Sequence, residues 1–118
     1  MKMSLKIERL ESIFEKEISM ILQTEIKDKD IQFVTITGVE ITNDLSLAKV
    51  YFTTLQDDKR DDTIQALNHA SKYIKHELSE RIEHIRKMPD LKFLYDESIA
   101  YGNKIDAIID EIKNEDGN

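Results

Sequence analysis

Apolar residues recur along this chain with two different periods, and the change of period divides the chain into elements. Over residues 4–26 they recur every three or four positions, which predicts an amphipathic helix capped at Ser4. The charged run 27–30 is expected to end this helix. The predicted apolar face consists of Ile7, Leu10, Ile13, Phe14, Ile18, Ile21 and Leu22.

Residues 33–54 alternate between apolar and polar side chains, which predicts two strands joined by a polar turn at residues 42–44. The alternation through Val34 and Ile36 slips by one residue beside Gly38 and resumes at Val39. Such a slip beside a glycine indicates a β-bulge, which twists or redirects a strand. On the second strand, the side chains expected to face the core are Ala48, Val50 and Phe52.

The second half of the chain returns to the helical period. Asp62 is the expected cap of a helix, and its apolar positions continue as far as Pro89, which ends the pattern. The small residues Ala70 and Ser71 mark the point where this helix is expected to bend or break. Two consecutive helices are therefore predicted between the second strand and residue 89.

A third strand is predicted at residues 91–96, and Ser98 is expected to cap a last helix. The predicted fold class is α+β in the order α-β-β-α-α-β-α, with one domain over residues 1–113 and a flexible tail at 114–118. Two strands, a broken helix pair and a returning strand are typical of the type II K-homology arrangement, in which nucleic acid lies beside the break. The Gly-x-x-Gly loop of that arrangement is absent, so a bend is expected to replace it.

Length and composition narrow the class of protein. At 118 residues the chain should form a single domain, and its lack of cysteine excludes disulfides, thiolate zinc sites and cysteine nucleophiles. No apolar run is long enough to span a membrane, so a soluble cytoplasmic protein without a membrane partner is expected. The net charge is −7, yet residues 69–92 hold six basic side chains against four acidic ones. The molecule is thus acidic overall, with one relatively basic region.

Winding residues 72–87 as one helix gathers cations beside its apolar stripe. Such a flank suits the phosphate backbone of a nucleic acid, because bound Lys and Arg displace condensed counterions. The alternative interpretation is a solvated helix face with ordinary ion pairs within the helix. The predicted RNA-binding residues are Ala70, Ser71, Lys72, Lys75, His76, Arg86 and Lys87.

Several short motifs follow one another through nearly the whole chain. They are Glu25-x-Lys27-Asp28, Val34-Thr35-Ile36-Thr37-x-Val39-Glu40-Ile41, Asp44-Leu45-Ser46-x-Ala48-Lys49-Val50-Tyr51, Ala70-Ser71, Pro89-x-Leu91-x-Phe93-x-Tyr95-Asp96-x-Ser98 and Tyr101-Gly102-x-x-Ile105. In this order they closely resemble the ribosome-binding factor A family. The resemblance implies a K-homology variant in which an Ala-x-Gly helix kink replaces the Gly-x-x-Gly loop. Lys72 stands here at the position of the kink glycine, which leaves Ala70 and Ser71 to shape the kink.

The resemblance also implies a function. It predicts a non-enzymatic assembly factor that binds the maturing small (30S) ribosomal subunit and assists late maturation and processing of 16S ribosomal RNA. It predicts a monomer without a cofactor, with an assembly GTPase as a further partner. Lys72, Lys75, Arg86 and Lys87 would contact phosphates in such a complex.

Two other functions stay open on the sequence alone. An acidic protein-interaction module would dock a basic partner, such as a ribosomal protein or an assembly GTPase, through acidic residues of the segment 106–111. A metal-dependent hydrolase would use His76, Glu80 and His84, which recur every four residues on one helix side. Because the chain shows no matching set of nucleophile, base and orienting group, we do not expect catalysis.

Overall fold

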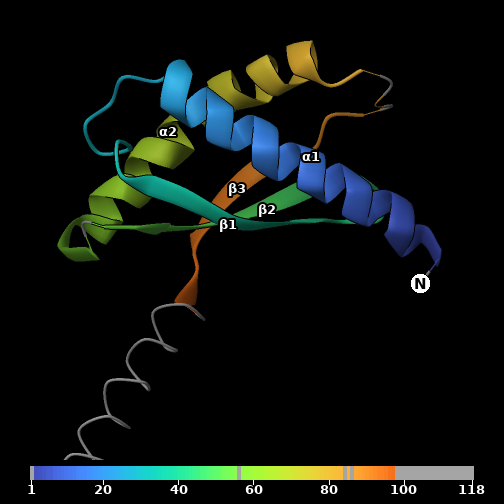
Figure 1. Cartoon of the computed structure of the whole chain (residues 1–118), viewed down its shortest axis with the longest axis horizontal. Helices are drawn as coiled ribbons and strands as arrows, with labels where there is room; N and C mark the ends of the chain where they lie inside the picture. The colour runs from blue at the N-terminus through green and yellow to red at the C-terminus, as the bar shows by residue number, and fades with distance from the viewer. Residues whose placement is uncertain (1, 56, 84, 86, 98–118) are drawn as a thin grey trace, which may run out of the picture.

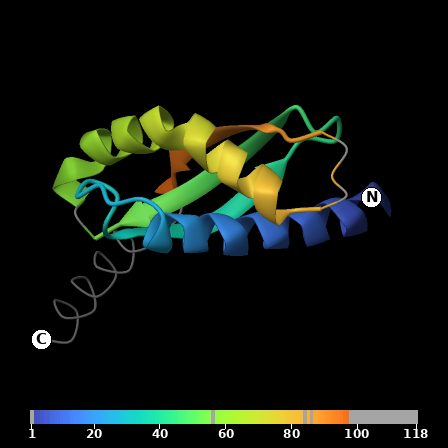
Figure 2. The ribbon, with the colours of Figure 1, turned by 90° about the horizontal axis from the view of Figure 1, so that it is seen from above.

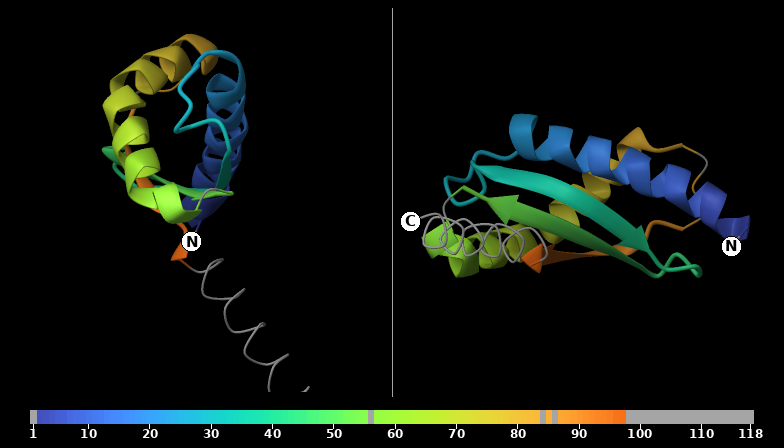
Figure 3. Two further views of the ribbon diagram at one scale, coloured as in Figure 1. Left: turned by 90° about the vertical axis from the view of Figure 1, so that its left-hand side faces the viewer. Right: turned by 60° about the horizontal axis from the view of Figure 1, so that its bottom comes forward.

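The structure, a computed structural model, describes residues 2–55, 57–83, 85 and 87–97. Their elements are the helix α1 (Lys2–Thr24), the strands β1 (Val34–Ile41) and β2 (Leu47–Thr54), the short 3-10 helix η1 (Asp57–Lys59), the helix α2 (Arg60–Arg81) and the strand β3 (Asp90–Tyr95). The described strands form one sheet in the order β1-β2-β3, and both α1 and α2 lie on the same face of it (Figures 1 and 3). This two-layer arrangement confirms the predicted α+β class. The predicted last helix and the tail at 114–118 lie outside the described residues.

α1 packs on the sheet through one apolar face. Phe14, Ile18 and Ile21 are fully buried, and their spacing of four and three residues places them on one side of the helix. The helix begins at Lys2, so Ser4 lies inside it and the predicted cap at Ser4 is wrong. The helical backbone extends further toward the N-terminus than the apolar positions indicated. Ile13 was predicted to lie on the apolar face but is 40% exposed.

β1 and β2 are antiparallel, and the predicted bulge is confirmed. Ile36 pairs with Phe52 and Gly38 pairs with Tyr51, which leaves Thr37 as the extra residue of β1. Gly38 does not adopt a positive φ, and a methyl group on its Cα would meet no atom within 4 Å. The bulge therefore does not depend on the conformational freedom that is special to glycine.

The polar turn between β1 and β2 is also confirmed, and side-chain hydrogen bonds hold it. The Asp44 carboxylate accepts hydrogen bonds from the Ser46 hydroxyl (2.8 Å), the Thr42 hydroxyl (2.8 Å) and the Ser46 backbone N–H (3.0 Å). These bonds, that of the Ser46 hydroxyl first, lower the pKa of Asp44 to about 2. Leu45 adopts a left-handed φ of 60°, and its side chain packs against the core.

α2 begins at Arg60, directly after η1. Lys59 occupies the N-cap position without a side-chain capping bond, so the predicted cap at Asp62 is wrong. Asp62 lies instead in the first turn, where its negative charge is favourable beside the free N–H groups of the helix end. The buried side chains of α2 share one face of the helix: Thr63, Leu67, Ile74 and Leu78.

The predicted break of this helix into two is wrong, because α2 is continuous through residues 69–72. The helix does bend, since its first, green part and its later, yellow part run in different directions (Figures 1 and 2). Within α2 the Ser71 hydroxyl donates a hydrogen bond to the Asn68 carbonyl oxygen at 2.9 Å. A hydroxyl that bonds the preceding turn in this way favours helix bending.

α2 ends at Arg81, so the prediction of helix as far as Pro89 is wrong. Ile82 has an extended backbone (φ −107°, ψ 115°), although its N–H still donates to the Leu78 carbonyl oxygen at 2.9 Å. Ile82 is buried, and Ile85 and Met88 pack against the core from the non-helical segment that leads back to the sheet. These apolar residues thus belong to the core, but not to a helix.

β3 lies parallel to β2, at an edge of the described sheet, and confirms the predicted third strand. Leu91 and Phe93 are buried, and the Tyr95 ring meets Phe52 edge-on, with 5.7 Å between ring centroids. The guanidinium of Arg60 lies 3.9 Å from the centroid of the Tyr95 ring. This contact anchors the start of α2 on the end of β3.

Candidate nucleic-acid interface

Two of the predicted RNA-binding residues share the outward face of α2. At about 100° per residue, Lys72 and His76 point away from the buried side defined by Leu67 and Ile74. Both side chains are exposed, and they lie one turn apart. Lys72 supplies the exposed positive charge of this part of α2, and both side chains need no change in the fold to reach a ligand.

Lys75 lies at the border of α2 and β3, where it is already paired. Its Nζ donates a hydrogen bond to Asp90 Oδ1 at 2.7 Å, and the two side chains are 37% and 76% exposed. This hydrogen bond is the main cause that lowers the pKa of Asp90. In the free protein, the charge of Lys75 is therefore neutralised by a neighbouring carboxylate.

The prediction that Lys87 lies on the same helix flank is wrong, because α2 ends six residues earlier, at Arg81. Lys87 is exposed in the segment that leads to β3, and its charge contributes to the lowered pKa values of Asp90 and Asp44. The residues predicted to form one cationic helix flank are thus divided between the outward face of α2 and the neighbourhood of Asp90. Arg86 lies outside the described residues.

Ala70 and Ser71 are half-buried rather than displayed to a ligand. Ala70 packs against the core, and the Ser71 hydroxyl is bonded to the Asn68 carbonyl oxygen. The side-chain oxygen of Asn68 in turn accepts a hydrogen bond from the Phe93 N–H at 3.5 Å, which ties α2 to β3. These residues position the helix next to the strand.

The face of the sheet opposite to the helices holds another set of charges, which sequence reasoning did not bring together. Glu40, Lys49 and Lys92 are register partners across β1, β2 and β3. The Tyr51 hydroxyl donates to Glu40 Oε1 at 3.0 Å, and this bond is the main cause that raises the pKa of Tyr51. Only strand register, which the sequence leaves open, places these side chains in one row.

An acidic hollow of about 460 Å³ borders the first half of α2 and limits the cationic surface. Its lining residues are Asp28, Asp30, Asp62, Gln65, Ala66 and His69. His69, although it belongs to the relatively basic stretch of the sequence, therefore lines the same hollow as three carboxylates. The cationic surface of α2 is confined to the part of the helix that follows this hollow.

The sequence suggested a weak metal site at His76, Glu80 and His84. His84 lies outside the described residues, and among the residues that the structure does describe no three His, Asp or Glu side chains lie close enough to hold a metal ion. In the same part of the chain, no helix is long and apolar enough to cross a membrane.

A family model described as "Ribosome-binding factor A" matches residues 6–109, which run from the second turn of α1 through every later described element to β3. This chain belongs to the ribosome-binding factor A family. The match confirms the resemblance inferred from the order of the sequence motifs.

Two relatives illustrate how closely the chain follows this family. The ribosome-binding factor A of Staphylococcus carnosus is 46% identical over 113 residues, which cover 95% of this chain and 97% of the relative. That of Macrococcus caseolyticus is 47% identical over 111 residues, which cover 93% and 96%. The similarity therefore extends over whole chains and is not confined to one motif.

Solved structures of the family share the fold. The crystal structure of ribosome-binding factor A from Thermus thermophilus superposes with a TM-score of 0.69 at 22% identity, covering 75% of this chain and 93% of that one. The solution structure of a putative ribosome binding factor A from Thermotoga maritima gives a TM-score of 0.63 at 27% identity, covering 74% and 83%. A homology model of the Thermus protein, fitted into an electron-microscopy map of a 30S complex, gives 0.60 at 23% identity, covering 73% and 90%.

Proposed function

We propose that this protein is a non-enzymatic assembly factor that binds the maturing small (30S) ribosomal subunit and assists late maturation and processing of 16S ribosomal RNA. The observation that supports this most strongly is the family match over residues 6–109. A ribosome binding factor A from Thermus thermophilus has been fitted into a map of its 30S complex, and this chain shares that fold. A cytoplasmic monomer without a cofactor is consistent with this role.

The proposed RNA contact lies on α2 and on the segment that follows it. Lys72 and His76 are exposed on the outward face of α2, and Lys87 is exposed beyond the helix end. Lys75 can contact phosphate only in competition with Asp90, 2.7 Å away. The bend of α2 takes the place of the K-homology Gly-x-x-Gly loop in this proposal, with Ala70 and Ser71 as its positioning residues, and Arg86 adds a further cation.

The proposed mechanism is differential binding. A factor that binds one conformation of ribosomal RNA more tightly than another shifts the population only by the difference between the two affinities. Cationic side chains supply sequence-independent affinity, because each phosphate contact releases a condensed counterion. The shape of the surface around α2 then has to distinguish the conformations.

The test is co-sedimentation of the purified protein with small subunits, large subunits and assembled ribosomes across a salt titration. Selective pelleting with free small subunits, lost as salt rises, is the expected result. Lys72→Gln should weaken binding and reduce the slope of log affinity against log salt by about one unit. Lys59→Gln, a matched charge removal at an exposed position before α2, should leave both unchanged. Absence of pelleting with any ribosomal particle at low salt would refute the proposal.

The alternative function is an acidic module that docks a basic ribosomal protein or an assembly GTPase. The hollow lined by Asp28, Asp30 and Asp62 favours this alternative, since it presents carboxylates to solvent. It predicts that the partner is still captured after RNase treatment of a lysate. It also predicts that Lys72→Gln leaves capture unchanged. The acidic residues 106, 110 and 111, named for this alternative from the sequence, lie outside the described residues.

A further inference from the structure

α1 separates its charges onto different faces. Lys6, Arg9 and Lys16 are all exposed, and their spacing of three and seven residues places them on one side of the helix, along about 15 Å of its axis. The acidic residues Glu8 and Glu15 lie on another side, toward Glu11. A protein with a net charge of −7 thus presents a positive stripe on the solvent side of its longest described helix.

The three cations of this stripe have no carboxylate partner among the residues that the structure describes. None of Lys6, Arg9 and Lys16 has an acidic residue three or four positions away, where intrahelical ion pairs form. Within the described part of the chain, none of the three forms an ion pair or a side-chain hydrogen bond. The ordinary explanation of a charged helix face, mutual pairing, therefore does not apply to this stripe.

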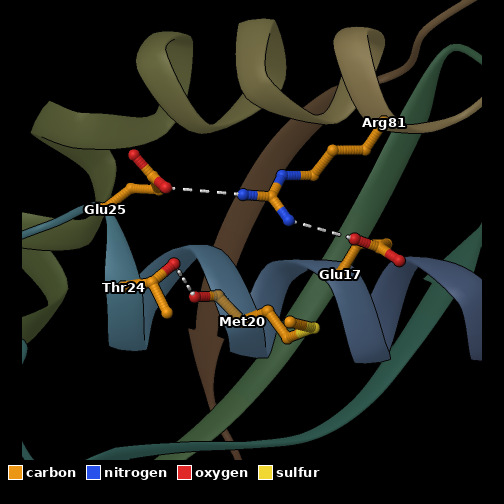
Figure 4. Close-up of polar contacts among 5 residues, drawn as sticks. All are labelled: Glu17, Met20, Thr24, Glu25 and Arg81. Carbon is orange, nitrogen blue, oxygen red and sulfur yellow. Dashed lines mark hydrogen bonds and ion pairs between the residues drawn. The ribbon is translucent and has the colours of Figure 1, made fainter.

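Three other carboxylates of α1 and its C-terminal end are engaged in contacts with other elements. Glu11 Oε2 accepts a hydrogen bond from the Ile41 N–H at 2.8 Å, which ties α1 to the edge strand β1. Glu17 and Glu25 face Arg81 of α2, with nitrogen–oxygen distances of 3.4 Å and 3.6 Å (Figure 4). Because these carboxylates take part in other contacts, they do not pair with the outward cations of α1.

An unpaired stripe of this kind has a cost in the free protein. Lys6 and Arg9, three positions apart, are like charges on neighbouring turns of the helix, so they repel each other. Ile13 and Met20, which lie on the same side, are 40% and 43% exposed. Isolated apolar side chains are common on protein surfaces, so the uncompensated charge is the more informative property of this face.

We propose that the outward face of α1 is a second RNA contact, at which Lys6, Arg9 and Lys16 bind the phosphate backbone. This inference rests on the proposed function and adds a surface to it. α1 and α2 lie in the same layer above the sheet, so one extended RNA surface can meet the outward sides of both helices (Figure 2). A polyanion matches three separate, uncompensated cations better than a protein surface does, because it offers a regular row of negative charges.

The test compares two variants that each remove three positive charges. In the first, Lys6, Arg9 and Lys16 are changed to Gln. In the control, Lys27, Lys29 and Lys59, which are exposed and distant from the stripe in sequence, are changed to Gln. Affinity is measured against a short labelled RNA duplex of arbitrary sequence and against purified small subunits, each across a salt titration. Far-ultraviolet circular dichroism and thermal unfolding verify that both variants are folded.

The stripe variant should lose affinity for both ligands, with the slope of log affinity against log salt reduced by roughly two to three units for three lost contacts. The control should stay close to the wild type. Equal losses in both variants would overturn the proposal, since net charge alone would then explain the effect. Loss of subunit binding with an unchanged duplex slope would also overturn it, by assigning the stripe to a protein partner.

The outcomes separate this inference from the proposed function. If the wild type pellets with small subunits and the stripe variant does so equally well at every salt concentration, the second contact is refuted while the proposed function stands. If the wild type pellets with no ribosomal particle, the proposed function fails, and the duplex measurement alone decides whether α1 binds phosphate. A wild type that does not bind the duplex at low salt would refute the second contact.

Discussion

Thr37 donates its hydroxyl hydrogen to the carboxylate of Asp96, with 2.5 Å between Thr37 Oγ1 and Asp96 Oδ2. Thr37 lies on β1 and Asp96 follows β3, so the bond passes over the central strand β2. The β-bulge makes this possible, because Thr37 is the extra residue and has no partner on β2. The bulge thus connects the two outer strands of the described sheet, in addition to twisting β1.

Thr37→Val should lower the free energy of unfolding by about 1–2 kcal/mol, because it removes a hydrogen bond to a charged acceptor at a partly buried position. Chemical denaturation monitored by circular dichroism measures this change. Thr35→Val, the same substitution at an exposed position of β1, is the matched control and should have little effect. Equal changes in the two variants would show that the Thr37–Asp96 bond contributes nothing to stability.

Arg81 joins the end of α2 to two carboxylates of the α1 side, those of Glu17 and Glu25 (Figure 4). Its side chain is 26% exposed, so solvent screens these pairs only in part. Arg81→Ala should therefore destabilise the fold by about 1 kcal/mol or less. Arg81→Lys should recover only part of the loss, because the guanidinium reaches Glu17 and Glu25 with two separate nitrogens, whereas an ammonium group has only one. Thermal unfolding of both variants, with Arg9→Ala as the unpaired control, tests this.

The turn between β1 and β2 should weaken only in strong acid. The folded-state pKa of Asp44 is lowered from 3.8 to about 2, so its ionised form stabilises the turn. That contribution is fully present above about pH 4 and is lost as the pH falls through about 2. Carboxyl chemical shifts of Asp44 followed by NMR would show the midpoint. Asp44→Asn should abolish this pH dependence, and a midpoint near pH 4 in the wild type, about the value of an unperturbed Asp, would contradict it.

Asp90→Asn should strengthen binding to small subunits, because it releases the charge of Lys75 for phosphate. The salt dependence of affinity should also become steeper by up to about one unit of slope. Asp58→Asn, a matched change at an exposed site, controls for net charge. In the wild-type background, Lys75→Gln should cost less affinity than Lys72→Gln. Binding of Asp90→Asn that equals the control would remove Lys75 from the proposed interface.

Gly38→Ala should be tolerated, although the glycine marks the bulge in the sequence. The position has no positive φ and has free space around the added methyl group. A compatible Gly→Ala change reduces the entropy of the unfolded chain and is worth roughly 0.4–1 kcal/mol in favour of folding. Urea denaturation shows whether the substitution raises or lowers the free energy of unfolding. A clear loss of stability would mean that the bulge needs glycine after all.

The strands, the bulge, the turn and the family could all be inferred from the amino-acid sequence. Alternation at a period of two is dictated by the geometry of a half-buried strand, so Ala48, Val50 and Phe52 could be assigned to the core before the fold was known. The slip beside Gly38 could be read in the same way. These features are local, because the pattern that predicts each of them is made by residues adjacent in the sequence.

The end of α2 and the pairing of its lysines became visible only in the folded chain. Ile82 and Ile85 continue a helical spacing, but the chain must leave the helix for β3 to pair with β2, so packing overrides the period. Lys75 and Lys72 are equivalent in the sequence, yet only Lys75 meets Asp90, fifteen positions further along. Likewise, Glu17 and Glu25 are engaged by Arg81 from another helix. Charge pairing over such separations depends on the fold, because the partners share no local element.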